Sequence, residues 1–114
     1  MPPTSNAKST KSREKIAEIQ CTLSAMEYLS SGTLLKRMKV CGNPRCHCAS
    51  DPAARHGPYF EWSCLKGGKL HHRTLTPEQA DIMRLAIANN RNAKKLLRAW
   101  EAQTLNLIEV TAPK

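Results

Sequence analysis

Three cysteines and one histidine lie close together in one segment, residues 41–59, which reads CGNPRCHCASDPAARHGPY. Three thiolates and an imidazole form the donor set of closed, tetrahedral zinc sites. The predicted Zn²⁺ ligands are Cys41, Cys46, Cys48 and His56. The Gly-Asn-Pro sequence between the first two cysteines allows the tight turn that such a site needs. The segment therefore predicts a small domain built around a structural zinc ion.

The cysteines also allow other interpretations. His47 is an alternative fourth ligand, but its place between Cys46 and Cys48 directs its side chain away from theirs in an extended link. The segment could instead be a reduced loop of small buried thiols, or its C-x-C sequence could form a redox pair. A disulfide framework is disfavoured because the chain has five cysteines, an odd number. The two remaining cysteines, Cys21 and Cys64, are predicted to be core thiols.

The charge balance indicates a polyanionic partner. The chain carries 18 basic and 9 acidic residues, a formal net charge of +9. Residues 31–75 hold eight of these basic residues and only two acids, a balance of +6. Nucleic acid is the leading candidate, with DNA favoured over RNA, and the alternative is a basic protein without such a partner. The predicted phosphate contacts are Lys36, Arg37, Lys39, Arg45, Arg55, Lys66, Lys69 and Arg73.

Several other classes of protein find no support in the sequence. The N-terminus lacks the apolar core of a secretory signal, and no apolar run approaches the ~20 residues that span a bilayer. We therefore expect a cytoplasmic protein without a membrane partner. The chain has no zinc-deaminase signature, no glycine-rich phosphate loop and no pair of acids placed as general acid and base. We therefore expect no enzymatic activity.

The first half of the chain predicts a tail, a helix and a strand. Residues 1–12 are polar and basic and are expected to form a disordered tail. Apolar residues then recur at three- and four-residue steps, which predicts an amphipathic helix over residues 13–30. Imperfect alternation over residues 33–40 predicts a strand that leads into the cysteines.

A β-hairpin is predicted next. Residues 59–65 and 70–75 have the composition of β-strands, and Gly67-Gly68 between them is typical of a hairpin turn. The first strand has two faces, because successive side chains alternate. The side chains predicted to face the core are Phe60, Trp62 and Cys64.

A long helix over residues 77–110 is predicted to close the chain. Thr76-Pro77-Glu78-Gln79 is typical of a capped helix start. A helix of this length on so small a body must project or pack against a partner. The alternative function is therefore a protein-interaction adaptor, or a homodimer assembled through this helix. We expect residues 13–110 to form one zinc-stabilised α+β domain, with an N-terminal helix, a zinc knuckle with a small sheet and the long helix.

The cysteine segment also resembles that of a known family. The residues that carry the resemblance are Gly32-Thr33-Leu34, Arg37, Cys41-Gly42, Cys46, Cys48, His56-Gly57-Pro58-Tyr59 and Gly67-Gly68-Lys69. They are similar to the C-G-x-x-x-C-x-C, H-G-P-Y and G-G-K pattern of small uncharacterised bacterial proteins, over about residues 31–100. The resemblance implies a small zinc-binding module associated with mobile genetic elements, and no established activity. Asn43 and His47 depart from the pattern, because the family more often has basic residues there.

Overall fold

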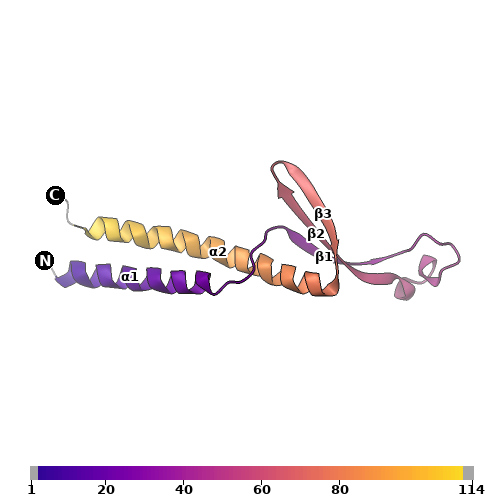
Figure 1. The fold of residues 1–114 in the computed structure, drawn as a ribbon, viewed down its shortest axis with the longest axis horizontal. Helices are drawn as coiled ribbons and strands as arrows, with labels where there is room; N and C mark the ends of the chain where they lie inside the picture. The colour runs from indigo at the N-terminus through magenta and orange to yellow at the C-terminus, as the bar shows by residue number, and fades with distance from the viewer. Residues whose placement is uncertain (1–2, 112–114) are drawn as a thin grey trace. The chain divides into compact units, whose positions relative to one another are not determined.

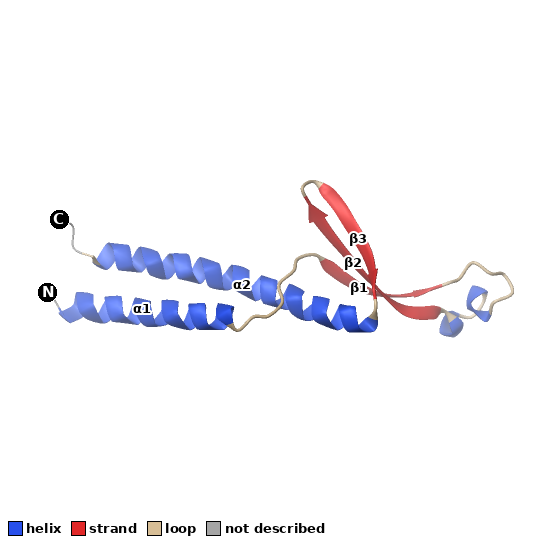
Figure 2. Ribbon diagram, in the orientation of Figure 1, coloured by secondary structure: helices blue, strands red, loops and turns tan. Residues whose placement is uncertain are grey.

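The computed structural model describes residues 3–111, with side chains from residue 7 onward. The fold is α+β, as predicted (Figures 1 and 2). Its elements are α1 (Pro3–Ser24), β1 (Thr33–Lys39), β2 (His56–Lys66), β3 (Lys69–Leu75) and α2 (Pro77–Val110), with short 3₁₀ helices η1 (His47–Ala49) and η2 (Pro52–Ala54). The chain divides into two compact units, where the sequence predicted one domain. The helical unit comprises Met1–Glu27 with Asn89–Lys114, and the sheet unit comprises Tyr28–Ala88.

The helical unit consists of α1 and the later part of α2, which lie side by side and run antiparallel (Figure 1). In both helices the buried and half-buried side chains alternate at steps of three and four residues. This spacing is that of a two-helix coiled coil. The stripe on α1 is Ser9, Ser12, Ile16, Ile19, Leu23, and the stripe on α2 is Ala93, Leu96, Trp100, Gln103, Leu107.

The helix α1 begins and ends earlier than predicted. It starts at Pro3, where proline suits the first turn of a helix, so the expected disordered tail is helical over residues 3–12. Residues 1 and 2 lie outside the described residues. Ser12 is only 6% exposed because it lies on the inner stripe of α1, which carries small polar residues at this end. Cys21 is exposed, so its prediction as a core thiol was wrong.

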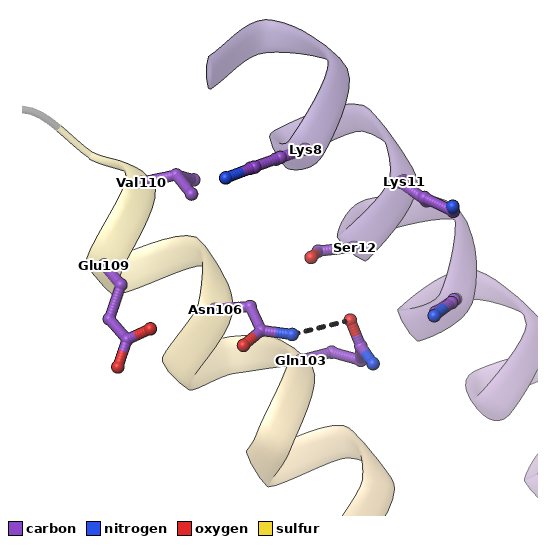
Figure 3. A pocket seen from close by; sticks show the side chains of 8 residues that line it. Lys8, Lys11, Ser12, Gln103, Asn106, Glu109 and Val110 are labelled. Atoms are coloured by element: carbon purple, nitrogen blue, oxygen red, sulfur yellow. Dashed lines mark hydrogen bonds between the residues drawn. The ribbon is translucent and has the colours of Figure 1, made fainter. Parts of the chain in front are cut away.

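The inner stripe of the helical unit is polar near the ends of the two helices. A groove of about 350 Å³ separates the side chains there (Figure 3). Its lining residues are Lys8, Lys11, Ser12, Lys15, Gln103, Asn106, Glu109 and Val110. Within it the Asn106 amide donates a hydrogen bond to Gln103 Oε1 at 3.4 Å (Figure 3). Polar groups therefore line the space between the two helices at this end.

The sheet unit is built on a three-stranded antiparallel sheet in the order β1-β2-β3. The predicted hairpin is confirmed, with Gly67-Gly68 as its turn and a first strand that starts three residues earlier than predicted, at His56. Of the predicted inner face, Cys64 is buried and Phe60 and Trp62 are half-buried. The small core also includes Ala80, Ala86 and Ile87.

The predicted capping box opens α2. The backbone N–H of Gln79 donates to Thr76 Oγ1 at 3.1 Å, and the N–H of Thr76 donates to Gln79 Oε1 at 2.9 Å. The helix then runs to Val110, as predicted. Within residues 3–111, no helix combines the length and apolar character that a bilayer crossing requires.

Candidate metal centre

The donor atoms of the four predicted ligands come together in the sheet unit. Each lies within 4.8 Å of the others, and the residues are Cys41, Cys46, Cys48 and His56. Two of the pairs are Cys46 Sγ with His56 Nε2 at 3.3 Å and Cys41 Sγ with Cys48 Sγ at 3.5 Å. Thiolates around a tetrahedral zinc ion are roughly 3.7 Å apart, so the cluster is close enough to hold a metal ion. His47 is exposed and outside the cluster.

Short local structures position each sulfur. Cys41 follows the end of β1, and its backbone N–H donates to Cys48 Sγ at 3.4 Å. The Asn43 carbonyl accepts from the N–H of Cys46 at 3.0 Å, and this three-residue closure is a β-turn with Pro44 in its second position. The Asn43 side chain also accepts from the Arg45 N–H at 3.0 Å. The turn and the following η1 lie in the connection between β1 and β2 (Figure 2), and the thiols from this connection meet in one cluster.

The fourth ligand is held by an irregularity between β1 and β2. His56 is the first residue of β2 and pairs with Lys39, but the pairing shifts between Arg37 and Lys39. Gly57 provides this shift with a φ of +131°, which a side chain would make strained. A Cβ at this position would also lie 2.8 Å from the Arg37 carbonyl oxygen. A glycine beside this candidate ligand avoids both the backbone strain and the clash.

The thiols differ in acidity. Hydrogen bonds from the Cys48 backbone, then from the Cys48 and His56 side chains, lower the pKa of Cys46 to about 6. The Cys41 backbone N–H lowers the pKa of Cys48, but burial and the neighbouring thiols outweigh this effect and raise it. Accumulating negative charge opposes full deprotonation of the cluster. A bound dication would remove that opposition, so metal binding and proton release are linked.

The donor set determines what the cluster can do chemically. Three sulfurs and one imidazole nitrogen fill the four positions of a tetrahedral ion, which is the arrangement of a structural site. A catalytic site usually leaves one position open for water or substrate. The cluster therefore fits a metal-stabilised small domain.

The eight predicted phosphate contacts are all exposed, but they do not lie on one surface. Arg37 and Lys39 share one face of the sheet, where both form ion pairs with Glu61. Lys36 and Arg73 lie on the opposite face, as their pairing with the strand residues Phe60 and Trp62 shows. Two contacts flank the hairpin turn, and two lie in the connection between β1 and β2; these are Lys66 and Lys69, and Arg45 and Arg55.

The sequence interpretation missed Glu61. Its side chain is only 7% exposed, although it lies on the strand face opposite to the predicted core face. The sequence signal that could have identified Glu61 was an acidic residue in one predicted strand beside a second predicted strand rich in basic residues. Cross-strand pairs of opposite charge stabilise a sheet, but which residues meet depends on the register.

Comparison with protein families assigns the chain to one family. A family model described as a domain of unknown function, DUF6788, matches residues 10–84, and the chain belongs to this family. The matched part contains most of α1, the whole sheet, the candidate metal centre and the start of α2. Neither the curated proteins nor the solved structures include a significant match to the chain.

Proposed function

We propose that this chain is a non-catalytic, zinc-stabilised module that binds nucleic acid, with DNA favoured over RNA. One observation carries the proposal. All eight basic side chains of residues 31–75 are exposed, whereas the two acids of the same segment are an exposed Asp51 and a buried Glu61. The solvent-accessible charge of the sheet and of the β1–β2 connection is therefore strongly positive, which favours a polyanion as partner.

Zinc is the metal that this donor set suits, because thiolates and imidazole in a closed tetrahedron are its typical structural ligands. The role proposed for the ion is structural. The buried apolar residues of the sheet unit are few and mostly small: Cys48, Cys64, Ala80, Ala86 and Ile87. A structural zinc site can supply on the order of 10 kcal/mol of apparent folding free energy, which offsets so small a core.

The shape of the sheet supports DNA over RNA. Six of the seven residues of β3 are exposed, and the tip of the β2–β3 hairpin extends beyond the end of β1, so this end of the sheet is a two-stranded ribbon. A two-stranded ribbon fits the major groove of B-form DNA, whereas the major groove of A-form RNA is deep and narrow. The tip of the hairpin carries Lys66 and Lys69, which could then reach phosphates.

The test is the salt dependence of binding. The zinc-loaded chain is titrated into fluorescent duplex DNA, single-stranded DNA and duplex RNA, and anisotropy is measured from about 50 to 200 mM salt. We expect tightest binding to duplex DNA, with a slope of log K against log salt of about −4 or steeper. Absence of binding to all three at low salt, or affinity independent of salt, would overturn the proposal.

A second candidate function is association through the later part of α2. Leu97, Leu105 and Ile108 are 50–64% exposed on one side of this helix. They line a shallow apolar groove of about 610 Å³ together with Trp100, Glu101 and Thr104. Contiguous apolar surface of this kind favours a protein partner or a second copy of the chain. The concentration dependence of the molecular mass tests self-association.

A further inference from the structure

One face of the sheet carries a charged cluster that is separate from the metal ligands. The register places Glu61 in the central strand, opposite Leu35 in β1 and Thr74 in β3. Because side chains alternate along each strand, the neighbouring residues on this face include Tyr59 on β2. We define the Glu61 face as the side of the sheet with Arg37, Lys39, Tyr59, Glu61 and His72.

Glu61 is covered by the basic side chains that it binds. Arg37 Nε lies 3.3 Å from Glu61 Oε2, and Lys39 Nζ forms an ion pair with the other carboxylate oxygen. His72 Nε2 lies 3.8 Å from Oε2 on the opposite side. Each carboxylate oxygen therefore has a basic partner, and the pairs join all three strands.

The cations of this cluster remain available to a ligand. The side chains of Arg37 and Lys39 are 56% and 47% exposed, so much of each faces solvent. Lys39 Nζ also lies 5.5 Å from the centre of the Tyr59 ring, and Tyr59 is 39% exposed. The buried carboxylate thus restricts two exposed cations beside an accessible aromatic ring. Such restriction lowers the entropy cost of forming phosphate contacts.

We propose that the Glu61 face is the surface that contacts the phosphodiester backbone, an inference that rests on the proposed nucleic-acid function. Arg37 and Lys39 bind phosphate oxygens, and the exposed Tyr59 ring contacts a sugar or base. Glu61 is a positioning residue, because it acts through the two cations. The opposite face, which carries Lys36 and Arg73, contributes only long-range attraction.

A charge-neutralising substitution distinguishes positioning from net charge. Glu61→Gln removes a negative charge from a basic protein, so attraction by net charge alone predicts tighter binding. Positioning predicts the opposite, because an amide offers one acceptor oxygen in place of two and no negative charge to hold the two cations in place. The matched control is Asp51→Asn, which removes the other acid of the segment and keeps an acceptor for the Ala53 N–H. We expect Glu61→Gln to weaken duplex binding about 5-fold and Asp51→Asn to tighten it slightly.

A second pair of variants tests the role of the Glu61 face even if Glu61→Gln does not fold. Lys36 and Arg37 are neighbours in β1 on opposite faces, and each carries one positive charge. We expect Arg37→Gln to weaken binding about 10-fold and Lys36→Gln less than about 3-fold. Zinc content and circular dichroism of each variant report whether the fold is intact.

The outcomes separate the two proposals. Suppose that the wild-type chain binds duplex DNA. If Glu61→Gln then binds more tightly, or if Lys36→Gln and Arg37→Gln lose affinity equally, the role of the Glu61 face is overturned and the proposed function stands. Wild-type chain that binds no nucleic acid at low salt overturns the proposed function itself. Weaker binding by folded Glu61→Gln, with tighter binding by Asp51→Asn, supports both.

Discussion

Cys46 Sγ lies 3.3 Å from His56 Nε2, although the two residues are ten positions apart in sequence. The contact joins the turn after β1 to the first residue of β2. It is short enough for both atoms to bind one metal ion. The candidate metal centre therefore closes the single long connection between β1 and β2 on itself.

Metal removal is the first prediction. We expect native mass spectrometry to find one zinc ion per chain, and chelation to unfold the sheet unit because the ion contributes on the order of 10 kcal/mol. Cys46→Ser and His56→Ala should lose the ion. His47→Ala is the matched control, since its exposed ring is outside the cluster, and it should keep the ion. A metal-free chain with an unchanged circular dichroism spectrum would contradict this account.

The second prediction concerns pH in the metal-free protein. The pKa of Cys46 is lowered from 9.0 to about 6, first by a hydrogen bond from the Cys48 backbone. Its thiolate therefore adds stability that is complete above about pH 9 and is lost as pH falls through about 6.

Alkylation by iodoacetamide measures this acidity directly, because the thiolate is the reactive form. We expect the alkylation rate of Cys46 to reach half its maximum near pH 6, measured by peptide mass spectrometry. The buried Cys48, whose pKa is raised, should react far more slowly in the same sample. A midpoint near the ordinary thiol value of 9.0 for Cys46 would argue against these hydrogen bonds to Cys46.

The third prediction tests the glycine beside the histidine ligand. Gly57 and Gly68 both have positive φ, of +131° and +79°. A Cβ at Gly57 would lie 2.8 Å from the Arg37 carbonyl oxygen, whereas a Cβ at Gly68 would meet no heavy atom within 4 Å. We expect Gly57→Ala to lower the free energy of unfolding in urea by about 2 kcal/mol more than Gly68→Ala does, because it adds a clash to the backbone strain. It should also weaken zinc affinity. Equal effects of the two substitutions would contradict the clash.

The fourth prediction tests association through α2. If copies pair through the apolar groove, light scattering should show a mass that rises with concentration. Leu105→Glu should abolish this rise, because it buries a charge in the contact. The control is Leu70→Glu, since Leu70 is 71% exposed on the hairpin and outside α2. A wild-type chain that is monomeric at every concentration would exclude self-association through α2.

Local chemistry made several features predictable from sequence. The capping box of Thr76 and Gln79 was readable because both hydrogen bonds form between residues three apart. The hairpin was readable because Gly67 and Gly68 both adopt positive φ, which few residues tolerate. The metal cluster was predictable because three cysteines and a histidine in one segment, residues 41–56, supply the donor set of a structural zinc site.

Features that depend on non-local contacts were not readable. The helical start at Pro3 was missed because Ser9 and Ser12 are not apolar, yet both belong to the inner stripe of α1. Cys21 was predicted to be buried because cysteine often is, but it lies off that stripe and is exposed. The burial of Glu61 follows from partners that only the strand register brings together.

The position of the metal ligands at the strand ends has a consequence for strand alignment. Cys41 follows β1 and His56 begins β2, so an ion bound to both would fix one strand against the other. A slip of one residue would move every side chain of β1 to the other face of the sheet. Arg37 and Lys39 would then leave Glu61 and lie beside Phe60. A bound ion would thus determine which face of the sheet is positively charged.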